Sequence, residues 1–328
     1  MYLPSASDLD AAAAIVYDAM LPTPQLSWPL LNQALDAEVW VKHENHTPTG
    51  AFKVRGGLVY MQRLAACLPG VKGIVLATRG NHGQSLAFAA RRHGVAATIV
   101  VPHGNSVEKN AAMRALGARL IEFGDDFQAS REHAQMLAAR DGLHMVPSFH
   151  EDLVAGVATG WMELLRAQPQ LDVLLVPIGQ GSGICAAIAA RHVLGLGTCI
   201  IGVVSTQAPA YQLSFRARRS IAAPVSTVLA DGMACRVPDP ESLAAMLECV
   251  DDVVAVSDAE VASAMRLYYS ATHNLAEGAG AAPLAAALQL KDDQRFKGRK
   301  IGLPLTGANV DADWFQRVLQ GNAPFGRE

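Results

Sequence analysis

The strongest constraint on the fold is an alternation of short apolar runs with helical segments along most of the chain. Continuous apolar runs are typical of strands buried on both faces, as in a parallel sheet covered by helices. We expect strands over residues 38–42, 73–78, 97–101, 119–123, 144–146, 172–177, 199–204, 253–256 and 300–305. We expect helices over residues 83–93, 107–116, 125–140, 154–166 and 257–269, and from residues 183 and 311. The pattern predicts an α/β protein whose least regular stretch is 206–252.

Composition and charge narrow the class of protein. Hydrophobic residues make up 51% of the 328 residues, enough for a sizeable core in two domains or one large one. A net charge of −3 without a dense Lys/Arg stripe argues against nucleic-acid and membrane partners, and no apolar run reaches the length of a membrane span. Five scattered cysteines without a C-x-x-C motif argue against disulfides or a zinc knuckle. Ser7 and Asp10, at capping-box spacing, predict an N-terminal helix and no leader. We expect a soluble cytoplasmic protein.

A glycine-rich loop, Gly179-Gln180-Gly181-Ser182-Gly183, follows a predicted strand and opens a helix. Glycine lets backbone N–H groups converge, and the helix dipole adds positive potential, so such a loop can bind a phosphate. A tight turn without a ligand explains the loop equally well. The dinucleotide fingerprint G-x-G-x-x-G fails because Ile184 stands at its last position.

Two more polar loops follow predicted strands, and parallel strands bring such loops to one edge of a sheet. Thr78-Arg79-Gly80-Asn81-His82-Gly83-Gln84 includes Asn81, whose amide suits a phenolate-like oxygen, although Gly-Asn-His-Gly could equally form a bare turn. In the segment 305–309, Thr306 could form one hydrogen bond to a ligand or cap a helix.

Lys53 lies among small and apolar neighbours in the segment 49–57. Burial disfavours an ammonium ion, so the pKa of a buried lysine falls and its neutral amine can act as nucleophile or base. A solvated lysine at a helix start is the simpler interpretation of any single lysine. Together with a phosphate cradle, an amide and a hydroxyl at three strand ends, however, Lys53 completes the groups of a pyridoxal phosphate site.

With these motifs in this order, the chain resembles the fold-type II pyridoxal-phosphate enzymes, specifically the threonine/serine dehydratase (ammonia-lyase) group, to which serine racemase is related. The resemblance covers nearly the whole chain, through residues 23–24, 40–45, 50–56, 78–84, 179–183, 230–232, 277–281 and 306–309. It implies an α/β fold of two open parallel-sheet domains with the cofactor in the cleft between them. Residues 1–54 and 151–328 would form a large cofactor-binding domain, and residues 55–150 a small mobile domain whose closure excludes water.

The resemblance also implies a role for each matching residue. Lys53 would form a Schiff base with pyridoxal 5'-phosphate and take the substrate's α-proton, with Phe52 beside the ring. Asn81 would bond the ring's hydroxyl oxygen, and Thr306 would face the pyridine nitrogen. The phosphate would be bound by Gly179, Gln180, Gly181, Ser182 and Gly183. The substrate, an amino acid held by its carboxylate, would be bound by Thr78, Arg79, Gly80, Asn81 and His82. Members of the family usually form homodimers, so the resemblance also implies a homodimer.

The expected reaction is β-elimination from a β-hydroxy-α-amino acid similar to threonine or serine, which yields a 2-oxo acid and ammonia. A neutral hydroxyl at Thr306 cannot hold a pyridinium as a carboxylate would, so a long-lived carbanion is disfavoured, and loss of the β-hydroxyl avoids it. Racemisation and β-replacement are the alternatives within this fold. A nucleotide-binding dehydrogenase or a non-catalytic small-molecule binder is the alternative of another class.

Arg79 departs from the family, which usually has a small residue there or, in racemases, a serine base. An arginine stays protonated and cannot be that base, which argues against racemisation. Arg79 either contacts the substrate side chain, through a carboxylate or an aromatic ring, or forms a salt bridge pointing away from the pocket. In the first case the substrate is bulkier than threonine, such as a hydroxyaspartate, a phenylserine or a hydroxyectoine-derived compound.

Other departures concern metals and regulation. Residues 203–210, where the family's divalent-cation ligands should fall, contain no carboxylate, so we expect no Mg²⁺ or Ca²⁺ site. The segment His43-Glu44-Asn45-His46 is one residue short of the zincin motif, and we expect His43 to be structural. Ala51 replaces a serine that commonly precedes Phe-Lys. Because the chain stops at Glu328, we expect no amino-acid-sensing regulatory domain and no feedback by isoleucine.

Overall fold

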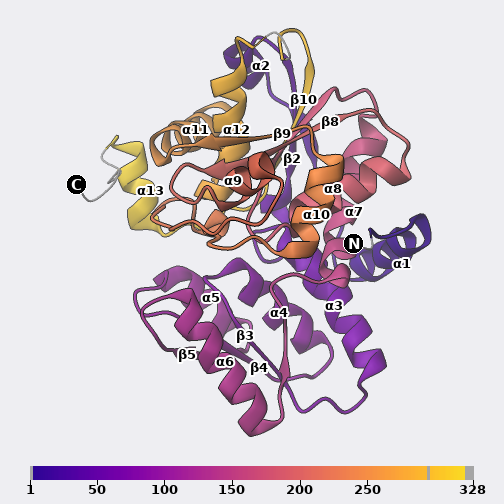
Figure 1. Cartoon of the computed structure of the whole chain (residues 1–328), viewed down its shortest axis with the longest axis vertical. Helices are drawn as coiled ribbons and strands as arrows, with labels where there is room; N and C mark the ends of the chain where they lie inside the picture. The colour runs from indigo at the N-terminus through magenta and orange to yellow at the C-terminus, as the bar shows by residue number, and fades with distance from the viewer. Residues whose placement is uncertain (1–2, 294–295, 322–328) are drawn as a thin grey trace.

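The chain forms two β-sheets, each packed with helices, which lie one above the other in the computed structural model (Figure 1). The structure describes residues 3–293 and 296–321. The larger sheet has the strand order β1-β2-β10-β7-β8-β9, parallel except for β1. Its strands are β1 (Gln25–Ser27), β2 (Glu38–His43), β7 (Val173–Pro177), β8 (Cys199–Ser205), β9 (Asp252–Val256) and β10 (Lys300–Leu305).

The smaller sheet is parallel throughout, in the order β5-β4-β3-β6. Its strands are β3 (Ile74–Ala77), β4 (Ala97–Val101), β5 (Arg119–Glu122) and β6 (His144–Met145). Sheet membership therefore changes after β2 and again after β6. The exact domain boundaries after residues 54 and 150 stay a prediction.

Helices connect the strands and cover the sheets. The first part of the chain contains α1 (Ala6–Ala19), α2 (Pro29–Leu35), α3 (Lys53–Cys67), α4 (Asn81–Arg92), α5 (Val107–Ala115), α6 (Phe127–Asp141) and α7 (Glu151–Ala167). The second part contains α8 (Ser182–Val193), α9 (Ala210–Ala217), α10 (Pro240–Cys249), α11 (Asp258–Thr272), α12 (Gly278–Leu290) and α13 (Ala312–Leu319). Short 3-10 helices lie at η1 (Glu44–His46) and η2 (Asp231–Met233). Among the described helices, none is long and apolar enough to cross a bilayer.

The central strands of the larger sheet are apolar without interruption because both of their faces are buried. In β7, Val173 and Leu175 pack with β2 residues Val39 and Val41 on one face. Leu174 alternates with them and packs on the other face, in the cluster formed with α7 and α8. This two-sided burial is the environment that the apolar runs predict.

The strands predicted from these runs all form, with ends within one residue. The N-terminal capping box forms two residues earlier in the chain than the expected pair Ser7 and Asp10. Ser5 caps α1 by accepting from the N–H of Asp8, and the Asp8 carboxylate accepts from the Ser5 N–H. Ser5 and Asp8 repeat the spacing of Ser7 and Asp10, so the pattern alone could not choose between the two pairs. In contrast, the capping box at Ser257 and Glu260 forms as predicted.

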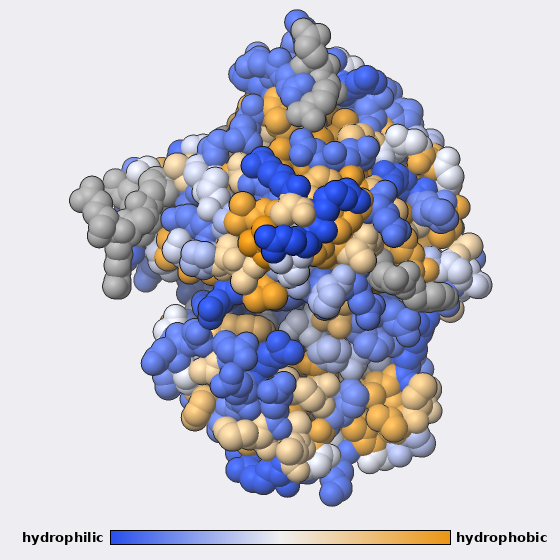
Figure 2. Space-filling view, viewed as in Figure 1, coloured by the Kyte–Doolittle hydropathy of each residue, from blue (hydrophilic) through white to orange (hydrophobic). Residues whose placement is uncertain are grey.

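Helix α3, which begins at Lys53, connects the two sheet units, because it packs against both α4 and α7. In the space-filling view, the surface is a mixture of hydrophilic and hydrophobic residues, hollowed where the two units meet (Figure 2). Since β3, β7 and β10 are parallel members of their sheets, the polar loops after them open toward this hollow.

Candidate active site

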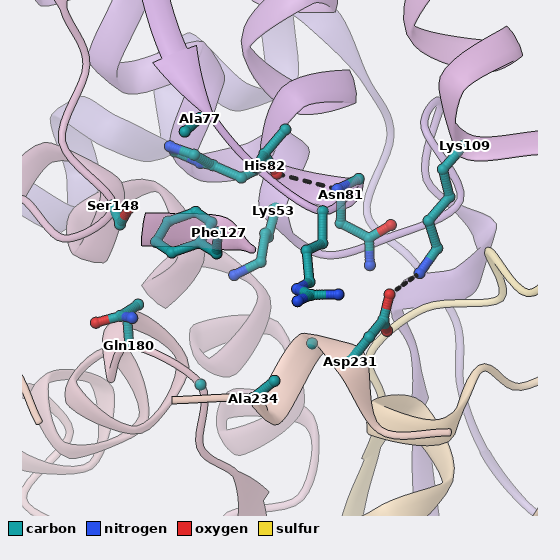
Figure 3. Close-up of a pocket in the computed structure, with 15 residues that line it drawn as sticks. Lys53, Ala77, Asn81, His82, Lys109, Phe127, Ser148, Gln180, Asp231 and Ala234 are labelled. Carbon is teal, nitrogen blue, oxygen red and sulfur yellow. Dashed lines mark hydrogen bonds and ion pairs between the residues drawn. The ribbon is translucent and has the colours of Figure 1, made fainter. Parts of the chain in front are cut away.

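Lys53 is the first residue of α3, and its side chain projects into a cavity between the two sheet units (Figure 3). The segment before it is fixed on both sides. Ala51 forms an antiparallel bridge with Gly307, and the Phe52 N–H donates to the Thr306 carbonyl at 2.9 Å. The Thr47 hydroxyl donates to the Ala51 carbonyl and accepts from the Ala51 N–H. This segment is therefore attached to the end of β10.

Burial lowers the pKa of Lys53 to about 8, although the Glu277 carboxylate acts in the opposite direction. The Lys53 Nζ lies 4.7 Å from the centroid of the Phe52 ring, and the apolar ring face adds to its poor solvation. An amine with this pKa is partly neutral near neutral pH, so Lys53 can act as a nucleophile or as a base.

The glycine-rich loop after β7 packs so tightly that side chains would not fit. Gly181 has a φ of +103°, and a Cβ there would lie 2.4 Å from the Cβ of Ser242. A Cβ on Gly179 would lie 2.5 Å from the Gly232 carbonyl oxygen. Tyr211 supports the loop, because its hydroxyl donates to the Gln180 carbonyl at 2.9 Å. The loop leads into α8, whose first N–H groups have no partners within the helix and can bind an anion.

The lysine and the glycine loop share a cavity of about 380 Å³. Its lining brings together Phe52, Lys53, Asn81, Pro177, Gly179, Gln180, Gly181, Ser182, Gly183, Gly232, Met233, Glu277, Ala279 and Thr306. These groups fit pyridoxal phosphate: an amine for its aldehyde, a glycine cradle for its phosphate, an amide for its ring hydroxyl and the Thr306 hydroxyl for its ring nitrogen. The Oε2 atom of Glu277 is buried and has no hydrogen-bond partner in the described structure, so the cavity lining includes a polar group left unpaired, as the site of a polar ligand would.

A second cavity, of about 720 Å³, adjoins the first and shares Lys53 and Asn81 with it. The residues predicted to bind the substrate, Thr78, Arg79, Gly80, Asn81 and His82, all line it. Lys109, Phe127, Ser148, Gln180 and Asp231 surround them, as Figure 3 shows. Burial lowers the pKa of His82 to about 3, so its ring is neutral, and its Nε2 lies 3.2 Å from the Pro147 carbonyl oxygen.

Arg79 has an exposed side chain that borders this second cavity. In the described part of the chain it forms no ion pair. One of the two expectations for Arg79 was a salt bridge pointing away from the pocket, and no such salt bridge is present among the described residues. An arginine without a carboxylate partner at the edge of a substrate cavity can bind an anionic or aromatic group of a ligand.

Sequence reasoning gave no role to two charged residues of the site, Glu277 and Lys109. Glu277 is the N-cap residue of α12, and its carboxylate accepts a hydrogen bond of 2.6 Å from the Asn81 amide and none from the helix. Lys109 Nζ pairs with Asp231 at 2.7 Å (Figure 3). The same Nζ lies 3.6 Å from Glu277 Oε2. Glu277 stood in a stretch that matched the family, a signal that could have found it. Lys109 looked like any solvated lysine in a helix, and nothing in the sequence marked it.

The residues considered for metal binding have other partners. His43 accepts a hydrogen bond of 3.0 Å from the Trp28 ring, and Glu44 binds Arg55 at 2.7 Å, so this segment is structural. Within residues 3–293 and 296–321, no group of three or more His, Cys, Asp and Glu side chains could hold a metal ion. None of the five cysteines forms a disulfide in the described structure.

Comparison with known proteins agrees with this geometry. A protein-family model described as "Pyridoxal-phosphate dependent enzyme" matches residues 16–307, which include the whole lining of the first cavity. The L-threo-3-hydroxyaspartate ammonia-lyase of Saccharomyces cerevisiae is 31% identical over 322 residues, 98% of either chain. The L-threonine ammonia-lyase of Thermotoga maritima is 31% identical over 291 residues, 88% of this chain and 72% of that protein. Among solved structures, maize serine racemase has a TM-score of 0.89 at 25% identity and covers 98% of both chains.

Proposed function

Because the chain belongs to the family of pyridoxal-phosphate dependent enzymes and its relatives are ammonia-lyases, it is a pyridoxal-phosphate-dependent lyase, and we propose that it converts a β-hydroxy-α-amino acid to a 2-oxo acid and ammonia. The observation that carries this proposal is the Lys53 amine. It is poorly solvated, has a lowered pKa, and shares one cavity with the glycine loop, Asn81 and Thr306.

The chain's own residues supply binding, orientation and proton transfer. When bound, pyridoxal phosphate supplies an electron-withdrawing ring that makes the substrate's α-proton acidic. Lys53 would hold the cofactor's aldehyde, and its neutral Nζ would accept the substrate's α-proton. Residues 179–183 would hold the phosphate and Asn81 the ring hydroxyl. The neutral hydroxyl of Thr306 would leave the ring a moderate electron sink, which favours elimination over transamination.

The substrate would bind in the second cavity, with its carboxylate on the loop 78–82. Arg79 would contact its side chain, which favours a substrate with an anionic or aromatic group. The relative named for L-threo-3-hydroxyaspartate matches 98% of this chain, against 88% for the L-threonine ammonia-lyase of the same identity, which supports this choice. Arg79 cannot act as a second base, which disfavours the racemase alternative.

Three further features belong to the proposal. The two sheet units would act as a large domain, 1–54 with 151–328, and a small domain, 55–150, that closes on the substrate. Five cysteines without a disulfide fit a reducing compartment such as the cytoplasm. The resemblance to the family implies a homodimer, which sedimentation would test.

The purified protein provides the test. We expect a visible absorption band and, after borohydride reduction, a peptide carrying the cofactor on Lys53. A panel of threonine, serine, 3-hydroxyaspartate and phenylserine, scored for release of 2-oxo acid, would identify the substrate class. A colourless protein whose reduced form carries no label on Lys53 would contradict the proposal. Chiral analysis of unreacted substrate, and assays with added sulfide, separate elimination from racemisation and β-replacement.

A further inference from the structure

The orientation of the Asn81 amide is determined by a chain of hydrogen bonds. Asn309 Nδ2 lies 2.9 Å from the Thr49 carbonyl oxygen, which can only accept, so this end of the Asn309 side chain is the donor. The same Nδ2 lies 2.8 Å from Asn81 Oδ1. The Asn81 oxygen therefore faces Asn309, and its NH₂ group faces away from Asn309.

Glu277 completes the chain on the other side. Its Oε1 accepts from Asn81 Nδ2 at 2.6 Å, a short distance for a hydrogen bond between an amide and a carboxyl group. This contact uses one of the two N–H bonds of the Asn81 amide. The second N–H is left for a ligand, and Asn81 lines the cavity that fits the cofactor.

The Glu277 carboxyl group itself is held firmly. The residue is only 3% exposed, and its backbone N–H donates to the Gly307 carbonyl at 3.0 Å. Gly307 has to lack a side chain, because a Cβ there would lie 2.5 Å from Glu277 Oε1. The other oxygen, Oε2, has no hydrogen-bond partner in the described structure, and the nearest cation, Lys109 Nζ, is 3.6 Å away. A buried carboxyl group with one unsatisfied oxygen is costly and needs a functional reason.

We propose that Glu277 is a positioning residue for the cofactor: its carboxyl group fixes the Asn81 amide so that the second N–H of Asn81 points at the cofactor's ring oxygen. This inference rests on the proposed function, since it assumes that pyridoxal phosphate occupies the cavity. It assigns Glu277 no contact with the substrate and no proton transfer. Either protonation state of Glu277 leaves Oε1 able to accept from Asn81.

A double-mutant cycle on the apoprotein tests the proposal, with the dissociation constant of pyridoxal phosphate as the readout. We expect Asn81→Ala and Glu277→Ala each to weaken binding about tenfold, the effect of losing one hydrogen bond. If Glu277 acts through Asn81, the double variant binds no more than about twofold weaker than Asn81→Ala alone. Glu277→Gln keeps the accepting oxygen, so its affinity should stay within about threefold of the wild type.

Two variants serve as controls. Thr306→Val removes a group at the same cavity that forms no hydrogen bond with Asn81 or Glu277 in the described structure, so its effect should multiply with that of Glu277→Ala. Glu277→Met keeps the side-chain volume without a good acceptor and replaces Glu277→Ala if the smaller residue prevents folding. Thermal unfolding of each apoprotein separates a loss of stability from a loss of cofactor affinity.

The possible outcomes are distinct. A double variant in which the two losses multiply to about a hundredfold would show that Glu277 acts independently of Asn81 and would overturn the proposal. Wild-type affinity in Glu277→Met would overturn it as well. If the wild-type protein does not bind pyridoxal phosphate at all, the proposed function fails along with this inference. Normal binding with multiplicative losses removes this inference alone.

Discussion

At the scale of single residues, the chemistry of the site depends on the balance between burial and charge around Lys53. Burial lowers its pKa and the Glu277 carboxylate raises it, and the net result is a value of about 8. An exposed lysine, with a pKa of about 10.4, is almost entirely charged at pH 7, whereas roughly a tenth of Lys53 is neutral. The neutral amine is the form that attacks an aldehyde.

The first prediction concerns the rate at which the apoprotein takes up pyridoxal phosphate. Since the neutral fraction of Lys53 rises with pH until its pKa is passed, the rate should rise about tenfold per pH unit below pH 8 and level off above it. Stopped-flow absorbance between pH 6 and 10 measures this profile. Nα-acetyl-lysine under the same conditions is the control, and its rate should rise until about pH 10. A protein rate that rises in parallel with the control would mean that Lys53 is not perturbed.

The second prediction concerns Arg79. Removing a charge-assisted hydrogen bond costs about 1.5–3 kcal/mol, so Arg79→Ala should lower kcat/KM for 3-hydroxyaspartate roughly tenfold to hundredfold. The value for threonine, which has no second carboxylate, should change less than about threefold. Arg131→Ala is the matched control, because Arg131 is also exposed but lines a neighbouring cavity whose lining does not include Lys53. If Arg79→Ala leaves the ratio of kcat/KM for 3-hydroxyaspartate to kcat/KM for threonine unchanged, Arg79 does not determine substrate specificity.

At the scale of elements, the parallel strands were predictable because burial on both faces makes them continuously apolar. Their order in the chain also predicts that the three polar loops meet, since parallel strands bring their carboxyl ends to one edge. Helix α12 was missed for a physical reason. Residues 278–287 are buried all round, so the helix has no polar face, and Pro283 lies within it. The strand β1 is only three residues long, too short for a periodic signal.

Side-chain contacts between distant elements cannot be predicted from strand and helix patterns. Asn81 and Glu277 are 196 residues apart, and Lys109 and Asp231 are 122 residues apart. Strand and helix patterns specify which face of an element is buried, but not which polar group of a distant element meets it. The residues predicted to bind the cofactor lie in local motifs, and Glu277 lies in a segment that matches the family, whereas the contacts of Lys109 arise only in the tertiary structure and no motif marks them.

The third prediction concerns the glycine loop. Gly181→Ala should weaken cofactor binding about tenfold or more and cost about 1–3 kcal/mol of stability, because the φ of +103° is strained for alanine and its Cβ would meet Ser242. Gly195→Ala, just beyond the other end of α8, is the matched control. Its φ is +62°, but no other atom lies within 4 Å of the added Cβ, so we expect a cost of about 1–2 kcal/mol with unchanged cofactor affinity. Apoprotein titration and thermal unfolding measure both quantities. Equal cofactor affinities for the two variants would contradict a phosphate cradle at residue 181.

At the scale of the whole molecule, a buried ion network ties the lysine-bearing helix α3 to the larger sheet unit. Arg55, fully buried, donates to Glu44 at 2.7 Å, to Glu163 at 2.7 Å and to Thr159 at 3.0 Å. Lys42 of β2 also pairs with Glu163 of α7, so two cations balance two carboxylates. The network connects β2, η1, α3 and α7, and through Arg55 it fixes the first turn of α3, where Lys53 lies.

The fourth prediction follows from this charge balance. Arg55→Met leaves two carboxylates buried with one cation, so it should lower the free energy of unfolding by about 3–5 kcal/mol. Arg92→Met breaks the ion pair with Asp18, in which both side chains are substantially exposed, and should cost less than about 1 kcal/mol. Urea unfolding compares the two variants. A loss for Arg55→Met as small as that of Arg92→Met would show that the network contributes little to stability.

The last prediction concerns how the two sheet units are held together across the cleft. The start of α5 contacts the larger unit at three points: Ser106 binds Asp311, the Glu108 carboxylate accepts from the Ala312 N–H at 2.8 Å, and Lys109 pairs with Asp231. Burial alone would lower the pKa of Lys109, but Asp231 and Glu277 raise it above its ordinary value, so Lys109 stays charged. Since all three contacts come from the start of helix α5 of the smaller unit, we expect this helix to hold the two units together across the cleft.

Lys109→Met removes the ion pair with Asp231 and should therefore weaken the contact between the two sheet units across the cleft. We expect amide hydrogen exchange of residues 106–115 to become about tenfold faster and KM for the amino-acid substrate to rise about tenfold, the effect of losing roughly 1.4 kcal/mol of closure. Arg114→Met, on the same helix but paired with Glu122 of the same unit, is the control and should change neither quantity. Because Lys109 also borders the substrate cavity, Asp311→Ala is needed as a second variant: it breaks the Ser106 contact outside that cavity. If closure depends on α5, both Lys109→Met and Asp311→Ala accelerate exchange, whereas an effect of Lys109→Met on KM alone would mean that Lys109 acts on the substrate and not on the cleft.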